Sequence, residues 1–253
     1  MSHIHLPDGV LPFAWWFLGD LVALGWLLLA LRRVGRPGQR PPLPLLGALG
    51  ACMLLTMSVP LGPLPLHLNL TVLTGILAGP WLGYITVLLV TAMLSLMGHG
   101  GLTVFGINSL ILGLEVSIGW WLFHRLCSHW RLDRRVLTAS LLALTISITV
   151  SFSIVGWSTG LWAAGLPGHG HDLHHHSDHT QVQSVSGVPA STCVSLKDAV
   201  IEWNFLGQSG LVALGLLFSM GLLAEGVATL VIARYLQKVR PDLLLSTRRG
   251  DGR

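Results

Sequence analysis

Charged residues are scarce in this chain of 253 residues. Lysine, arginine, aspartate and glutamate make up 10% of it, whereas apolar residues make up 52%. A soluble domain carries about a quarter of charged residues, so the composition excludes one. The net charge of +4 does not indicate nucleic-acid binding, because basic residues of a membrane chain gather in its cytoplasmic loops. We therefore predict an all-α integral membrane protein.

Several sequence signals are also missing. Cys52, Cys127 and Cys193 show no pairing pattern, which argues against a disulfide framework. No basic region and cleavage site of a signal peptide are found at the N-terminus, so its first residues are expected in the mature protein. The sequence has neither the His-Glu-x-x-His motif of zinc proteases nor a Gly-x-Ser-x-Gly elbow, so no enzyme is expected. It also lacks the convincing internal repeat that is common in secondary transporters.

Long apolar segments account for most of the chain. A spanning helix needs about 20 apolar residues. Such segments lie at residues 12–31, 44–60, 68–82, 83–98, 104–123, 136–165 and 208–236. Gly79-Pro80 separates the third from the fourth segment, and a helix is expected to break or kink there. The sequence thus predicts an N-terminal arm (residues 1–11), a bundle of about seven transmembrane helices (12–245) and a tail (246–253).

The basic residues predict the orientation of this bundle. With seven spans, three groups of them fall on one side of the membrane, and only Lys197 falls on the other. The three groups are Arg32, Arg33, Arg36 and Arg40; Arg125, Arg131, Arg134 and Arg135; and Arg234, Lys238, Arg240, Arg248, Arg249 and Arg253. Basic loops face the cytoplasm, so the N-terminus is expected outside and the C-terminus inside.

Most histidines fall on the opposite, outer side. His3 and His5 are in the N-terminal arm, while His67 and His99 fall in predicted outer links. Six more lie in the predicted outer loop 167–197: His169, His171, His174, His175, His176 and His179. Clustered imidazoles bind nickel, cobalt, copper and zinc with little selectivity. The flanking polar residues predict a disordered loop, which would be a metal reservoir or, alternatively, a solvated spacer.

The N-terminal arm carries the sharpest candidate site. A free α-amine, a backbone amide nitrogen and an imidazole one or two residues later can chelate one metal ion, and this nitrogen-rich planar geometry suits Ni(II) and Cu(II). The alternative is a frayed polar terminus. His67 is an ionisable residue at the edge of a membrane bundle, which favours a functional role; alternatively, it is hydrogen-bonded to Asn69. Carboxylates within the membrane, such as Glu115, are expected to be paired or to line a polar path.

Four blocks of the sequence resemble one family. They are His5-Leu6-Pro7-Asp8-Gly9-Val10-Leu11, His67-Leu68-Asn69 with LTGILAGPWLG after it, HGGLTVFGINSLILG (99–113) and AEGVATLVIARYLQKVRPDLL (224–244). Together they are similar to the CbiM/NikM family, the substrate-binding subunits of energy-coupling-factor transporters for cobalt and nickel. The blocks keep the family's order, and those at 67–83 and 99–113 are the most specific. The His-rich loop is not a constant feature of this family.

The resemblance implies a site and a mechanism. The metal ligands would come from Ser2, His3, His5 and His67, with Asn69, His99 and Asn108 as supporting residues. The transported ion would be Ni²⁺ or Co²⁺, with no prosthetic group. A transmembrane coupling subunit, two ATP-binding-cassette ATPases and a small accessory membrane subunit would be the partners, in a bacterial cytoplasmic membrane. The alternative function is a secondary transporter or channel for a transition metal that works alone.

The first block departs from the family's pattern. His5 aligns with a histidine that is the second residue in the family, so three extra residues separate it from the amine. Loss of Met1 would leave Ser2 as the amine and make His3 the second residue. With Met1 retained, His3 would be the third residue of a chelate that does not need His67. A start near Ile4 is the third alternative.

Overall fold

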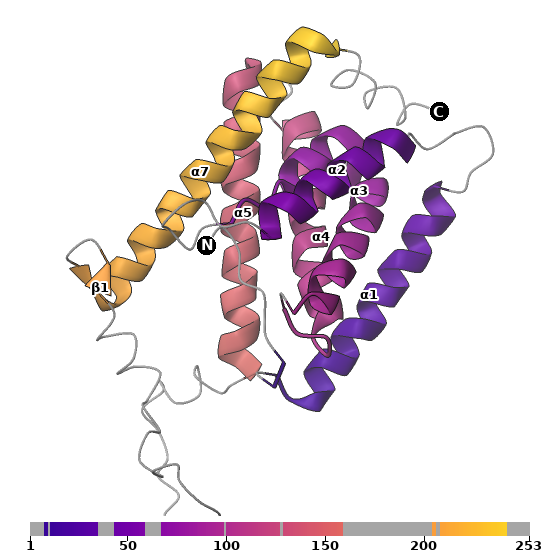
Figure 1. The fold of residues 1–253 in the computed structure, drawn as a ribbon, viewed down its shortest axis with the longest axis vertical. Helices are drawn as coiled ribbons and strands as arrows, with labels where there is room; N and C mark the ends of the chain where they lie inside the picture. Colours follow the sequence, from indigo (N-terminus) through magenta and orange to yellow (C-terminus); the bar gives the residue numbers. More distant parts are fainter. Residues whose placement is uncertain are drawn as a thin grey trace, which may run out of the picture.

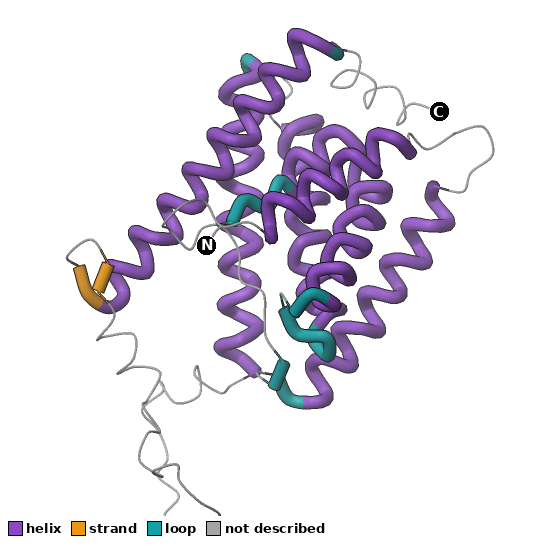
Figure 2. Tube along the Cα trace, viewed as in Figure 1, coloured by secondary structure: helices purple, strands orange, loops and turns teal. Residues whose placement is uncertain are grey.

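The fold consists of helices that run back and forth along one bundle (Figures 1 and 2). The structure is a computed structural model, and it describes residues 8–9, 11–34, 43–58, 67–98, 100–126, 129–158, 204–205 and 208–241. Its elements are α1 (Phe13–Val34), α2 (Leu43–Ser58), α3 (Thr71–Leu96), α4 (Phe105–Trp121), the π-helical turn η1 (Leu122–Leu126), α5 (Leu132–Ser158) and α7 (Gly210–Val239). A two-residue hairpin, β1 (Asn204–Phe205) and β2 (Gln208–Ser209), precedes α7.

Five of the described helices are long and apolar enough to cross a membrane. They are α1, α3, α4 together with η1, α5 and the part of α7 from Gly215 onward, whereas α2 is a shorter apolar helix of 16 residues. These elements confirm the prediction of a helical membrane protein. Helix α4 is the central element, because it contacts α1, α3 and α5 (Figure 1).

Helix α3 is broken where the sequence predicts it. Gly79 has φ 80° and ψ 175°, which is not helical, and Pro80 follows it. A Cβ atom on Gly83 would lie 3.6 Å from the Cα of Gly75, although eight residues of a straight helix span about 12 Å. The chain therefore turns back at Gly79, so that α3 consists of a short limb (71–78) and a long limb (80–96).

The short limb bears on the predicted helix count. Eight residues of helix are about 12 Å long, far less than the roughly 30 Å of a bilayer core. If the two limbs are counted separately, the described residues contain seven apolar helical segments, but residues 71–78 are too few to span a membrane. The prediction of seven full spans, like the predicted orientation, stays a prediction.

The described basic residues gather at one end of the bundle, which we call the basic end. The guanidinium of Arg33, at the end of α1, lies 5.4 Å from the ring centroid of Trp81, and Arg234 of α7 forms an ion pair of 2.8 Å with Asp133 of α5. The described lysine and arginine residues are all in α1, η1, α5, α7 or their flanks near this end: Arg32, Arg33, Arg125, Arg131, Arg134, Arg135, Arg234, Lys238 and Arg240. This clustering on one side is the pattern of cytoplasmic positive charge.

Glycine residues let α3 and α4 approach closely. A Cβ atom at Gly75 would lie 2.4 Å from the carbonyl oxygen of Val116, and one at Gly119 would lie 2.8 Å from Val72. On the long limb, Tyr84 packs against Gly113 in the same way. Between membrane helices, small residues replace the hydrophobic effect as the basis of tight packing. This packing holds both limbs of α3 against α4.

We expect Gly75→Ala to destabilise the protein by about 1–3 kcal/mol, because the added methyl group overlaps a backbone carbonyl that cannot move aside easily. The measurement is the thermal midpoint of the purified protein in detergent. Gly47→Ala in α2 is the matched control, since a Cβ there meets nothing within 4 Å. Equal midpoints for both variants would contradict the close packing described here.

Candidate metal site

His67 begins a short non-helical segment that enters the interior of the bundle. Its side chain is half-buried, and its Nδ1 atom is shielded from solvent. The segment ends with Asn69 and Leu70, which are 0% and 4% exposed. The sequence predicts His67 in a link at the outer surface, whereas the structure describes it next to fully buried residues. The half-buried His67 thus lies at the border between the surface and the interior of the bundle.

Glu115 of α4 binds the residues that follow His67. Its Oε1 atom accepts a hydrogen bond of 2.9 Å from the Asn69 side-chain amide and another from the hydroxyl of Thr71. All three residues are 0% exposed. An ionisable group inside a membrane bundle is costly and is usually paired or functional. Glu115 thus joins the middle of α4 to the start of the short limb of α3.

Leu70, between the two residues that Glu115 binds, has a strained backbone. Its φ of 57° and ψ of 15° lie in the left-handed region, which costs a residue with a Cβ atom roughly 1–2 kcal/mol. Leu70 is the only described non-glycine residue with a positive φ. Such strain persists only where the surrounding structure imposes it, and it concentrates at functional sites.

Asp8 attaches the N-terminal arm to the loop before α4. Its carboxylate accepts hydrogen bonds from the amide of Leu102 (3.0 Å) and from the amide and hydroxyl of Thr103 (2.8 and 2.5 Å). Gly101 permits this approach, since a Cβ atom there would lie 2.5 Å from an Asp8 oxygen. The last described residues of the arm are therefore held at the start of α4.

The same hydrogen bonds keep the Asp8 carboxyl ionised. The Thr103 hydroxyl, followed by the amides of Thr103 and Leu102, lowers the pKa of Asp8 from its ordinary value of 3.8. Since the folded pKa is the lower one, the attachment is fully present above the ordinary pKa and is lost as the pH falls below it. The attachment is thus intact at neutral pH.

A second aspartate satisfies a free amide in the first turn of α4. Asp20 of α1 accepts a hydrogen bond of 2.8 Å from the amide of Gly106. The first amides of any helix lack intrahelical partners and carry partial positive charge, so a carboxylate is stabilising there. Asp8 and Asp20 together fix the arm and α1 to the start of α4.

More buried polar atoms lie around Glu115. Glu225 of α7 is fully buried and interacts electrostatically with it, and Ser147 of α5 is next to its carboxylate. Ser140, two turns before Ser147 in α5, and Thr229, one turn after Glu225 in α7, are also 0% exposed. The side chain of Asn69 thus meets a polar region that α4, α5 and α7 share.

The structure places some of the predicted site residues and leaves others outside its description. Asn69 binds Glu115, and Asn108 is 2% exposed in the first turn of α4. Outside the described residues lie Ser2, His3, His5, His99, His169, His171, His174, His175, His176 and His179. Among the residues that are described, no group of three or more histidine, cysteine, aspartate or glutamate side chains could hold a metal ion. Of the four predicted metal ligands, the structure therefore describes one, His67.

The sequence reasoning missed the roles of Asp8, Thr71 and Leu70. The sequence blocks include Asp8 but predict no contact for it, and they predict no particular partner for Glu115. A carboxylate in an apolar segment is itself the signal for an internal partner. Nothing in the sequence marks Leu70, because leucine is not a residue that favours positive φ.

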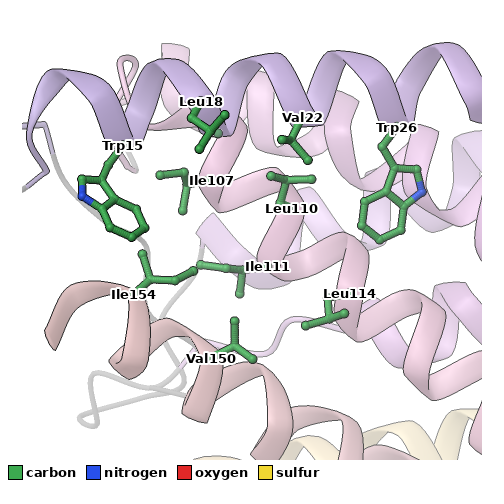
Figure 3. Close-up of a pocket in the computed structure, with 11 residues that line it drawn as sticks. Trp15, Leu18, Val22, Trp26, Ile107, Leu110, Ile111, Leu114, Val150 and Ile154 are labelled. Atoms are coloured by element: carbon green, nitrogen blue, oxygen red, sulfur yellow. The ribbon is translucent and has the colours of Figure 1, made fainter. Parts of the chain in front are cut away.

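An apolar pocket on the side of the bundle does not belong to this site. It has a volume of about 340 Å³, and Figure 3 shows Trp15 and Trp26 of α1 at its two ends, with Ile111 of α4 and Ile154 of α5 between them. It exposes no polar surface. Metal ions in proteins need oxygen, nitrogen or sulfur ligands, so this pocket is suited to hydrocarbon instead.

Comparisons with known proteins agree with a transport role. The family model described as "Cobalt uptake substrate-specific transmembrane region" matches residues 5–243. A cobalt transport protein CbiM of Anoxybacillus flavithermus is 26% identical over 218 residues, which cover 80% of this chain and 82% of that protein. A fused cobalt transport protein CbiMQ of Methanocorpusculum labreanum is 26% identical over 96% of this chain, but this chain spans only 36% of its length.

Solved structures share the fold. One described as a transition metal transporter has a TM-score of 0.62 and 20% identity, with 98% of this chain and 100% of that chain covered. A truncated transition metal transporter gives a TM-score of 0.61 and 19% identity, with coverage of 93% and 99%. At this level of identity the similarity concerns the fold alone.

We expect Asp8→Ala to speed hydrogen exchange severalfold at the amides of Leu102 and Thr103, because the variant removes their acceptor. The measurement is hydrogen–deuterium exchange of the purified protein, followed by mass spectrometry. The Gly106 amide is the internal control, since its acceptor is Asp20. Unchanged exchange at residues 102 and 103 would show that Asp8 does not hold this loop.

Proposed function

Since this chain belongs to the CbiM family of cobalt uptake substrate-specific transmembrane proteins, we propose that it is the substrate-binding subunit of an ATP-driven cobalt or nickel uptake transporter of the energy-coupling-factor type. It captures the divalent ion from outside and delivers it inward across the cytoplasmic membrane. The ion is cargo, so no prosthetic group is required. Separate subunits hydrolyse ATP.

The observation that carries this proposal is the position of His67. Its ring has one nitrogen shielded from solvent, at the entrance of a segment whose next residues are fully buried. A neutral imidazole is a good ligand for cobalt and nickel. An ion bound there would have left the aqueous phase but would still be near polar groups of α4. This is the location that a substrate site within a transporter needs.

The N-terminal arm is long enough to supply the other ligands. Asp8 is fixed beside Thr103, two residues before α4 begins, and the ten residues of α4 from Phe105 to Glu115 rise by about 15 Å. Six extended residues, from Ser2 to Asp8, reach at most about 20 Å. Ser2 and His3 can therefore reach the depth at which Asn69 binds Glu115. This length supports the proposal that the first residues of the arm meet His67.

The proposed ligands would favour nickel or cobalt over other ions. An amine, a deprotonated amide and two imidazoles form a planar nitrogen site. Zinc prefers tetrahedral sites, and Mg²⁺ prefers oxygen ligands. Because the amide must lose a proton, binding should become tighter as the pH rises. His99 and Asn108 would support this site, and the His-rich loop would raise the local metal concentration.

The proposed partners are a coupling membrane subunit, two ATP-binding-cassette ATPases and a small accessory membrane subunit. The fused relative supports the existence of a partner. Its name joins CbiM to a second component, CbiQ, and this chain matches only 36% of its length. The chain described here contains no ATP-binding motif of the Gly-x-x-x-x-Gly-Lys-Ser/Thr type. This is in keeping with the proposal that separate subunits hydrolyse ATP.

We expect His67→Ala to abolish cobalt and nickel uptake while the protein stays in the membrane, because one ligand of the site is removed. Uptake is measured with radioactive metal at limiting concentration, in cells that also express the partner subunits. His129→Ala is the matched control, since His129 is exposed at the basic end. Normal uptake by His67→Ala would refute the site, and uptake that persists without any ATPase would favour a transporter that works alone.

The role of the arm is tested on its first residues. With Met1 removed, we expect His3→Ala to lower nickel affinity much more than His5→Ala, because His3 then closes the chelate with the Ser2 amine. Mass spectrometry of the intact N-terminus establishes the processing, and diamagnetic nickel would support the planar site. An acetylated amine, or a larger loss for His5→Ala, would contradict this arrangement.

A further inference from the structure

The strained backbone of Leu70 lies between His67 and the short limb of α3. A leucine in the left-handed region is an outlier that needs an external constraint. The described neighbours supply one, because the residues on both sides of Leu70 donate hydrogen bonds to the same oxygen, Oε1 of Glu115. A glycine at this position would adopt the same backbone conformation without strain, but the chain has a leucine here.

We propose that Glu115 is a positioning residue for metal binding, which holds the turn 69–71 in its strained form and thereby fixes His67. The proposal rests on the proposed function of His67 as a metal ligand. Glu115 itself does not contact the ion. It acts through Asn69 and Thr71, both of which are fully buried.

The geometry explains why a contact at residue 115 can control residue 67. His67 precedes Leu70 by three residues, or about 10 Å of extended chain. A rotation of the Leu70 backbone to an ordinary region would redirect this whole stretch. Since the short limb is packed against α4 at Gly75 and Gly119, the helix cannot follow. The segment before Leu70 must therefore move, and His67 moves with it.

The local contacts make Glu115 the main constraint on this turn. The Leu70 carbonyl accepts hydrogen bonds of 3.0 and 3.1 Å from the amide and hydroxyl of Thr74, but these bonds belong to the first turn of the short limb. They fix the carbonyl side of Leu70 and leave its φ free. The hydrogen bonds from Asn69 and Thr71 to Glu115 hold the residues on both sides of Leu70, and they therefore restrict both of its backbone torsion angles.

The experiment measures the affinity of the purified full-length chain for Co²⁺ and Ni²⁺ alone. Glu115→Met removes the acceptor and is expected to lower affinity roughly fivefold to thirtyfold, which is the left-handed cost of Leu70 expressed as an equilibrium factor. Glu115→Gln keeps an oxygen acceptor and should retain most of the affinity. The absorption spectrum of bound cobalt should keep its band positions in Glu115→Gln, because the ligands are unchanged.

A second substitution distinguishes positioning from general damage. Adding Leu70→Gly to Glu115→Met should restore most of the affinity, because glycine adopts positive φ without strain. Adding Leu70→Ala should not, although it removes nearly the same side chain from the core. Where Glu115→Met fails to fold, Thr71→Val replaces it in the same series, since it removes one of the two hydrogen bonds and keeps the shape of the residue.

The outcomes separate this proposal from the proposed function. If His67→Ala binds cobalt and nickel as the natural chain does, the metal site itself is wrong. If His67→Ala loses binding but Glu115→Met keeps it, the site stands and the positioning role is overturned. Equal recovery by Leu70→Ala and Leu70→Gly would also overturn it, because only glycine relieves the backbone.

Discussion

The structure depends on the need to satisfy polar groups inside an apolar bundle. Water is absent from the hydrocarbon core, so each buried donor or carboxylate must find a partner within the protein. Helix α4 and the loop before it supply most of these contacts: Asp8 binds amides of that loop, Asp20 binds the Gly106 amide of α4, and Glu115 of α4 accepts hydrogen bonds from Asn69 and Thr71. Asp8 of the arm, α1 and the short limb of α3 are therefore all attached to α4 or to the loop before it. This is why the segment that follows His67 has a defined position in the bundle.

The features predicted from the sequence are those with local signals. Hydropathy predicted the apolar helices to within a few residues of their observed ends for α1 and α2, and proline predicted the break at Gly79-Pro80. Apolar content does not distinguish a short buried limb from a full span, so the count of seven full spans stays a prediction. The contacts between Asn69 and Glu115 and between Asp8 and Thr103 join residues 46 and 95 positions apart. Pairings over such distances are determined by packing, which one sequence does not reveal.

The packing of α3 on α4 shows how small residues and polar contacts cooperate. Gly75 and Gly119 bring the two backbones together, which places Thr71 within reach of Glu115. A larger residue at either glycine would separate the helices and would lengthen that hydrogen bond as well. The glycine residues thus contribute to the candidate site without touching it. From the sequence alone, these two glycine residues would be interpreted as helix-packing residues only.

A helix that begins inside the bundle also has an electrostatic effect. The short limb starts at Thr71, and the amino end of a helix carries a partial positive charge equivalent to about half a unit. In an apolar interior this charge would repel a cation at His67, four residues earlier. An oxygen of the Glu115 side chain lies at that helix start, where it accepts the hydrogen bond from the Thr71 hydroxyl, so a polar oxygen rather than hydrocarbon faces this end of the helix. If the proposed metal site is correct, this oxygen would lessen the repulsion between the amino end of the short limb and a divalent ion at His67.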